Sequence, residues 1–478
     1  MLRLSGTDAG FLYAETASWH MHAGAVIVLD PSTAPDRFDV DRVRQLIAAR
    51  LRLLGPFRYR LVEVPFGIDR PYWVEAVDLD LATHVQSASL PSPGGTSELG
   101  RFAADVFAHK LDRRRPLWKV WFVDGLAHGR VALVVKLHHA YVDGLRGARL
   151  YDVMVDADRE APLDRGVLLD DGATPRRPTP LAFTVATASG LALAPVRTAR
   201  ALASLARAIT GVARFARAPE HADVTLPFRA APGCFTGSLT PARSVAFSSL
   251  PMSLVRDMRE RHHVTFNDVV LTACTGAIRS YLLARGTAPT RPLVVAVPVG
   301  VRRETGAEPA VAVTPGNFIS AMGAQLPVHI DDPVDQLNAV VESTRSAKAL
   351  HRAFGSSFLL DLVDAVPPGA IAAAVRAYTS LHLEALHPPI FNLLVSNVAG
   401  ARAPVFLAGA RLLATYPLGP LLAGSGLNVT VLSHDEKVDA GFIACPDIVE
   451  DVWALANGLP PALELLAGSS GVVAGATA

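Results

Sequence analysis

The chain is poor in cysteine, in charged side chains and in aromatic residues. Of its 478 residues three are cysteines, 19% are charged and 7% are aromatic. Cys234, Cys274 and Cys445 are too widely spaced to predict a disulfide framework or a zinc cluster, and they suit a reducing cytoplasm. A formal net charge of +1 lacks the global basic character of nucleic-acid-binding proteins. We therefore expect no bound metal and no nucleic-acid partner.

The sequence also lacks an apolar run long enough to cross a membrane. The strongest candidate, residues 181–194, has roughly 14 residues between two prolines, whereas a spanning helix needs about 20. Asp8 lies where a signal peptide would need its apolar run, so secretion is not indicated. We expect a cytoplasmic protein, peripherally associated with the inner face of the membrane or with lipid bodies.

The length and the changes of composition predict two domains. One core supports roughly 250 to 300 residues, and this chain is much longer. Alternating strand-like and helix-like runs predict an N-terminal α/β domain over residues 1–156, with strands at 24–29, 118–123 and 131–137. Prolines then accumulate and the periodicity is lost, which predicts a crossover over residues 157–240. The α/β pattern resumes over residues 241–468, and residues 469–478 are expected to be a frayed tail. The strand-like runs of this second domain are 244–250, 293–299, 391–396, 411–416, 427–433 and 438–444.

The crossover contains an unusual basic segment. Between Gly172 and Pro219 there are seven arginines and no acidic residue. Apolar residues recur there at helical spacing, with the arginines largely on the other side of the wheel. This pattern fits an amphipathic helix at a membrane surface, and equally a packed crossover helix with a solvated basic face. The apolar positions are Leu202, Leu205, Ile209, Val212 and Phe215.

The pattern that points to chemistry lies at the end of an apolar strand, where His138 and His139 are followed by Asp143 and Gly144. Side chains alternate along a strand, so the two imidazoles should face opposite sides, which disfavours a shared metal. A neutral imidazole facing a cavity can accept a proton from a hydroxyl group and return it to a leaving thiolate. Asp143 suits a turn, and Gly144 permits close backbone approach. The alternative is two structural histidines before an ordinary turn.

These residues resemble the HHxxxDG signature of the coenzyme A-dependent acyltransferases, which include chloramphenicol acetyltransferase and peptide condensation domains. Among them the chain is most similar to the bacterial wax ester synthase/diacylglycerol acyltransferase family. The resemblance extends along most of the chain. Its other segments are residues 5–24, Leu111–Arg113, Pro116–Trp118, Asn267–Val270, Pro298–Arg302, Gly316–Phe318 and Ser396–Val398.

The resemblance implies an α/β fold with two chloramphenicol acetyltransferase-like sandwich domains, joined by a crossover linker, with a central tunnel. It implies that His139 is the general base, that His138 supports it, and that no acyl-enzyme forms. It implies no bound cofactor. The donor substrate would be a long-chain acyl-CoA, and the acceptor would be diacylglycerol or a fatty alcohol.

The resemblance assigns roles to further positions. Asp143 would be structural and would pair with Arg302 of the second domain. Asn267, next to Asp268, would be a candidate for binding the substrate or the oxyanion, although an Asn at a helix start is equally a plain N-cap. A final motif would pack along the tunnel wall. It comprises Pro116, Leu117 and Trp118.

Two other functions stay open. One is acyl transfer or condensation with a carrier protein as donor, and the other is a catalytically silent protein anchored on a lipid surface. The intact histidine motif favours an enzyme, and the sequence lacks the motifs of serine hydrolases, dinucleotide-binding proteins and P-loop proteins. The remaining histidines, His20 and His22 among them, have no comparable pattern and are expected to be structural or exposed.

Overall fold

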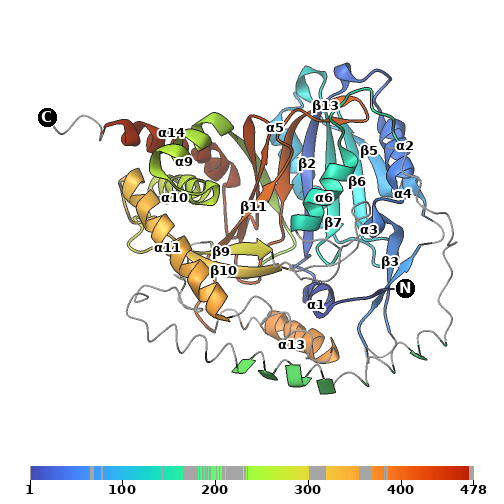
Figure 1. Cartoon of the computed structure of the whole chain (residues 1–478), viewed down its shortest axis with the longest axis horizontal. Helices are drawn as coiled ribbons and strands as arrows, with labels where there is room; N and C mark the ends of the chain where they lie inside the picture. The colour runs from blue at the N-terminus through green and yellow to red at the C-terminus, as the bar shows by residue number, and fades with distance from the viewer. Residues whose placement is uncertain are drawn as a thin grey trace.

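The computed structural model describes most of the chain outside the crossover. The described residues are 2–64, 69–76, 79–141, 144–164, 235–300, 319–354, 368–381 and 386–472, with isolated positions within 181–210 and at 230, 233 and 383. Two six-stranded sheets lie side by side within this part of the chain, each covered by helices (Figure 1). Most of the predicted crossover lies outside the described residues.

The first sheet is largely built from the N-terminal part of the chain. Its apolar residues alternate between two faces: Leu133 packs with Val43 of α2 (Val40–Arg50), and Val134 packs with Val106 of α5 (Thr96–Ala108). The predicted strands at 24–29, 118–123 and 131–137 are confirmed. The strand order is β12 (Phe406–Leu407), β13 (Ala410–Leu418), β2 (His22–Asp30), β7 (Val131–His138), β6 (Trp118–Asp124) and β5 (Val85–Ser89).

The second sheet comes from the C-terminal part of the chain. Its core is a single apolar cluster between the strands and the helices α9 (Met252–His262), α10 (Phe266–Ala284), α11 (Pro333–Phe354) and α14 (Val452–Val472). The predicted strands at 244–250, 293–299, 427–433 and 438–444 are confirmed. The strand order is β10 (Ile319–Leu326), β9 (Leu293–Gly300), β11 (Leu393–Ala399), β14 (Leu427–His434), β15 (Lys437–Ala444) and β8 (Ser244–Pro251).

One long strand connects the two halves. β13 lies late in the sequence, yet it pairs antiparallel with β2 in the first sheet. The buried Asp439 of β15 accepts hydrogen bonds from the backbone N–H of Thr415 in β13 at 2.7 Å and from the Ser249 hydroxyl of β8 at 2.6 Å. His434 contacts the same carboxylate at 2.8 Å. The bond from Thr415 joins the second sheet to the strand that completes the first, and the other two contacts hold the Asp439 carboxylate in place.

Shorter elements complete the described fold. The helix α1 (Gly6–Ala14) precedes β2 and lies beside α13 (Pro368–Ser380) at the lower edge of the molecule (Figure 1). Within the described part of the chain, none of the helices combines the length and the apolar character that crossing a bilayer requires. The remaining elements are β1 (Leu2–Arg3), η1 (Pro31–Thr33), α3 (Gly55–Arg58), β3 (Tyr59–Val62), β4 (Tyr72–Glu75), α4 (Leu81–His84), η3 (Ala127–Gly129) and α6 (Gly144–Met154).

Candidate functional site

The two motif histidines lie at the end of β7 in different surroundings. His138 is the last residue of the strand and its side chain is 1% exposed. His139 leaves the strand, donates its backbone N–H to the Met21 carbonyl at 2.8 Å, and keeps a half-buried side chain. Its imidazole lies against Phe11 of α1, with 4.5 Å between the ring centroids. The partly exposed imidazole is therefore that of His139, and the enclosed one is that of His138.

His138 is oriented by its own turn and by an acid. Its Nδ1 accepts the backbone N–H of Ala140 at 3.1 Å, so in the neutral ring the proton is on Nε2. That Nε2 lies 3.7 Å from Oε2 of Glu15, too far for a direct hydrogen bond but close enough for electrostatic attraction. Burial lowers the pKa of His138, and Glu15 opposes this effect only in part. His138 is therefore held as the neutral imidazole near pH 7.

Glu15 is a buried carboxylate held by two cations. Its side chain is 2% exposed, and its Oε2 accepts from Nε and Nη2 of Arg113 at 2.8 and 2.5 Å, while Nζ of Lys110 lies 3.6 Å from Oε1. Burial alone would raise its pKa, but His138 and Arg113 override burial and lower the pKa to about 2. No sequence pattern predicts a role for Glu15. Glu15 and Arg113 both lie in segments that carry the resemblance, and no local spacing links them.

A row of histidines continues behind His138. The rings of His22 and His138 meet edge to face with centroids 5.9 Å apart, and His20 follows 5.7 Å from His22. Nε2 of His22 accepts the backbone N–H of Leu111 at 3.4 Å. Burial, with the nearby charge of Lys136, holds the pKa of His22 well below its usual value. His22 thus extends the cluster beyond the two motif residues.

The segment Pro116–Trp118 supports the end of β7. The Leu117 carbonyl accepts the backbone N–H of His138 at 3.0 Å. Trp118 stacks between Phe57 and His84, with ring centroids 4.2 and 4.4 Å away, and donates its indole N–H to the Phe57 carbonyl at 3.0 Å. All three residues of the segment are buried. Their contacts are those of packing residues, and the tunnel wall stays a prediction.

The candidate pair Asn267 and Asp268 lies at the start of α10. Thr265 is the N-cap: its hydroxyl accepts the backbone N–H of Asp268 at 3.3 Å, and the Asp268 carboxylate accepts the Thr265 backbone N–H at 3.0 Å. Asp268 also accepts the Thr344 hydroxyl at 2.8 Å. The plain N-cap interpretation of Asn267 is therefore wrong, and Asp268 is occupied in fixing the helix start. Asn267 is half-buried in the first turn.

The structure describes only some of the remaining predicted site residues. Gly144 begins α6, immediately after the histidine loop. Asp143 and Arg302, the expected clamp between the domains, lie outside the described residues. In the described part of the chain, no group of three His, Cys, Asp or Glu side chains is placed to hold a metal ion.

Comparison with known proteins gives matches along nearly the whole chain. The family model described as the wax ester synthase/diacylglycerol acyltransferase catalytic domain matches residues 4–270, and the WS/DGAT C-terminal domain matches residues 315–467. A Mycobacterium tuberculosis protein named as a diacylglycerol O-acyltransferase is 34% identical over 468 residues, which cover 98% of this chain and 90% of that protein. Another from the same species is 33% identical over 465 residues, covering 96% and 95%.

Solved structures share the fold. The wax ester synthase/diacylglycerol acyltransferase from Marinobacter aquaeolei VT8 matches with a TM-score of 0.68 and 25% identity, covering 98% of this chain and 100% of that one. The first condensation domain of the calcium-dependent antibiotic synthetase matches with a TM-score of 0.57 and 16% identity, covering 98% and 95%, and this likeness shows the fold alone. The expected two-domain α/β fold of the chloramphenicol acetyltransferase type is confirmed.

Proposed function

Since the chain belongs to the wax ester synthase/diacylglycerol acyltransferase family and is an acyltransferase, we propose that it transfers a long-chain acyl group from acyl-CoA to a hydrophobic alcohol. The acceptor is diacylglycerol, which gives a triacylglycerol, or a fatty alcohol, which gives a wax ester. The observation that carries the proposal is the partly exposed imidazole of His139 at the end of β7, backed by the buried His138 and Glu15.

In the proposed mechanism His139 is the general base. It removes the proton from the acceptor hydroxyl as the oxygen attacks the thioester carbonyl. The tetrahedral intermediate collapses, the carbon–sulfur bond breaks, and the imidazolium returns the proton to the departing thiolate. Asn267 is the proposed donor to the oxyanion, by its place in the family motif. No covalent acyl-enzyme is needed, because both substrates are held at once.

The contacts around His139 support this role. Its backbone N–H is bonded to Met21, and its ring is held by Phe11, so the imidazole is fixed before the substrates arrive. Neutral His138 adds no competing positive charge beside it. Glu15, itself held by Arg113 and Lys110, lies 3.7 Å from Nε2 of His138 and helps to keep that ring in place beside His139.

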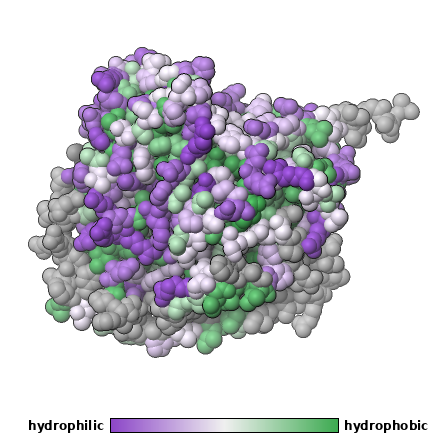
Figure 2. All heavy atoms as spheres, turned by 180° about the vertical axis from the view of Figure 1, so that it is seen from behind, coloured by the Kyte–Doolittle hydropathy of each residue, from purple (hydrophilic) through white to green (hydrophobic). Residues whose placement is uncertain are grey.

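We also propose that the protein associates peripherally with a membrane or lipid-body surface. Leu202 of the crossover is 62% exposed, although a helix packed on the domains would bury it. Val185 in the crossover and Leu386 after α13 are exposed as well. Figure 2 shows, from behind, hydrophobic residues gathered in patches at the lower edge of the molecule. Such patches, with the basic crossover segment, suit a surface of anionic lipid.

The test of the function is free-thiol release from palmitoyl-CoA by the purified protein. Hexadecanol and 1,2-dipalmitoylglycerol are offered separately, and His139→Ala is the control. Release that requires one acceptor and His139 supports the proposal and identifies the product. If no thiol is released with either acceptor, the proposal is contradicted. Palmitoyl-carrier protein is then offered as the donor, which tests the condensation alternative.

A further inference from the structure

The loop 16–21 between α1 and β2 contains a strained residue at the point where it meets His139. Met21, the last residue before β2, has a φ of 52°, in the left-handed region that residues with a side chain seldom adopt. Its side chain is 4% exposed, and its carbonyl accepts the backbone N–H of His139 at 2.8 Å. An unfavourable backbone conformation persists only where the surrounding contacts impose it.

The loop 16–21 is closed by hydrogen bonds of its own. The backbone N–H of Thr16 donates to the Trp19 carbonyl at 2.9 Å, and the backbone N–H of Trp19 donates to the Thr16 hydroxyl at 3.1 Å. Nε2 of the buried His20 donates to the Ala17 carbonyl at 2.7 Å. These bonds are local, so by themselves they leave the loop free to move as a unit relative to His139.

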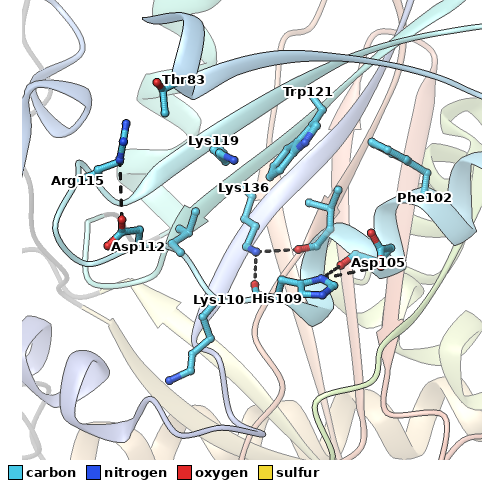
Figure 3. Close-up of a pocket in the computed structure, with 12 residues that line it drawn as sticks. Thr83, Phe102, Asp105, His109, Lys110, Asp112, Arg115, Lys119, Trp121 and Lys136 are labelled. Atoms are coloured by element: carbon cyan, nitrogen blue, oxygen red, sulfur yellow. Dashed lines mark hydrogen bonds and ion pairs between the residues drawn. The ribbon is translucent and has the colours of Figure 1, made fainter. Parts of the chain in front are cut away.

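The end of α5 gives the loop its first outside contact. Nδ1 of His20 lies 3.3 Å from the Phe107 carbonyl in the last turn of that helix. The same helix end is held by the buried Lys136 of β7, whose Nζ donates to the carbonyls of Val106, at 2.7 Å, and His109. Figure 3 shows both bonds of Lys136 at the end of α5. The loop therefore rests on a helix end that is itself fixed to the first sheet.

Two further contacts come from the second half of the chain. The indole N–H of Trp19 donates to the Leu421 carbonyl at 2.6 Å. Leu421 is buried in the connection from β13 to β14, which passes from the first sheet to the second. Arg243, directly before β8, donates from Nη2 to the Ser18 carbonyl at 2.5 Å and from Nη1 to the carbonyl of Thr240 on its own segment. Its guanidinium thus joins the start of β8 to the loop.

These contacts form a continuous path to His139. Trp19 and Arg243 are half-buried, and their loop partners lie 402 and 225 residues away from them or from the loop in the sequence. Hydrogen bonds from a charged guanidinium are stronger than those between neutral groups. The mechanism described above uses neither side chain. The position of β8 and of the β13–β14 connection is therefore transmitted through the loop, and through the Met21 carbonyl, to the backbone of His139.

We propose that Trp19 and Arg243 are positioning residues, which hold the loop 16–21 in the conformation that fixes His139. The proposed base is then in place only while the second sheet is docked against the first. This inference rests on the proposed function, because it takes His139 as the base. Loss of either bond lets Met21 relax from its strained conformation and turn its carbonyl away from His139.

The first test separates catalysis from binding. Trp19→Phe, which keeps an aromatic ring, and Arg243→Gln should each lower kcat about tenfold with little change in the KM for palmitoyl-CoA, since a displaced base slows the chemical step. Arg243→Lys keeps a charged donor and should recover part of the loss. Thermal unfolding of the same samples should show that all variants are folded during the assay.

Trp453→Phe is the matched control for the first test. Trp453 of α14 is also half-buried, but it meets Phe247 edge to face and lies outside the loop. Its replacement should leave kcat close to that of the original protein. Equal kcat values in Trp19→Phe and Trp453→Phe would overturn the positioning role of Trp19, and equal values in Arg243→Gln and the original protein would overturn that of Arg243.

A second test does not depend on activity. Hydrogen exchange of the His139 backbone N–H, followed by NMR, should be about tenfold faster in Trp19→Phe and in Arg243→Gln, because the bond to Met21 opens more often. The backbone N–H of Leu133, inside β7 between β2 and β6, should exchange at an unchanged rate.

The two tests fail in different ways. If the original protein transfers no acyl group, the proposed function fails, and the exchange rates still decide whether the loop holds His139. Unchanged exchange at His139 in both variants would overturn the inference whatever the activity. Faster exchange at Leu133 as well would show a general loss of stability, and would equally overturn a specific positioning role.

Discussion

Glu15 and Arg113 lie 98 residues apart in the sequence and form a partly buried ion pair of 2.5 Å behind the imidazole of His138. The pair joins α1 to the segment that follows α5. It keeps a carboxylate charged in a place where burial would otherwise neutralise it. The histidine loop at the end of β7 therefore rests on a preformed electrostatic support.

Replacement of the proposed base separates chemistry from folding. His139→Ala should lower kcat by about 100-fold or more, because proton transfer loses its acceptor. The melting temperature should change little, since the His139 side chain is only half-buried. The measurements are thiol release and thermal unfolding on the same preparation. Turnover at the original rate would remove His139 from the mechanism.

The Glu15 carboxylate should make stability fall in acid. Its pKa is about 2 in the folded protein against 4.5 for the free side chain. The stabilisation is therefore fully present above pH 4.5, amounts to about 3 kcal/mol there, and is lost as the pH falls toward 2. Urea unfolding between pH 2 and 7 should show this slope in the original protein and a weaker one in Glu15→Gln.

A matched control exists for that experiment. Glu63 contacts the same Arg113 at 3.6 Å but is exposed. Glu63→Gln should leave the pH dependence almost unchanged, because an exposed pair contributes little. Equal slopes for the original protein and Glu15→Gln would contradict the role given to the buried pair.

Burial of Lys136 should make the stability of the protein rise with pH in the alkaline range. Its folded pKa is about 7 against 10.5 for the free side chain. Between these values the unfolded chain binds a proton that the folded chain lacks, so stability should rise with pH from about 7 to 10.5. Lys136→Met should flatten this rise in urea unfolding, and Lys437→Met, on the exposed end of β15, should not. An unchanged slope in Lys136→Met would contradict the assignment.

Removal of the Asp439 carboxylate should cost more unfolding free energy than removal of one of its hydrogen-bond donors. Asp439→Ala removes a buried carboxylate with three partners and should cost about 3 kcal/mol of unfolding free energy. Ser249→Ala removes one donor and should cost about 1 kcal/mol. Chemical denaturation measures both. A loss as small in Asp439→Ala as in Ser249→Ala would show that the carboxylate does not fasten the sheets.

Membrane association should depend on the exposed apolar residues of the crossover. The double variant Val185→Ser, Leu202→Ser should bind anionic liposomes several-fold more weakly, because less apolar area enters the lipid. Leu465→Ser on α14 is the control, since that leucine is 60% exposed on another element. Sedimentation with vesicles measures binding. Equal losses of liposome binding in the double variant and in Leu465→Ser would indicate nonspecific hydrophobic adsorption rather than binding through this surface.

Much of the fold follows from local pattern. The apolar runs at 24–29 and 131–137 are strands because their residues are buried on both faces of the first sheet. The motif histidines could be recognised in the sequence because two imidazoles follow directly after the apolar run 131–137. The row of His20 and His22 was not, because it forms through pairing of β2 with β7, where His22 lies opposite His138.

Contacts between residues that are distant in the sequence do not follow from local pattern. The run 411–416 was correctly predicted as a strand, but its periodicity does not say which sheet it joins. Glu15 and Arg113 likewise meet only because α1 and the segment after α5 pack together. Periodicity reports which face of an element is buried, and these contacts depend on which elements pack together.

The position of β13 has a consequence for synthesis of the protein. The first sheet is complete only when residues 410–418 lie beside β2, so the N-terminal half has an open edge until most of the chain has left the ribosome. A product that stops before β13 exposes the backbone groups of β2 to other chains. The order of translation thus makes a late segment the one that protects the earliest sheet from aggregation.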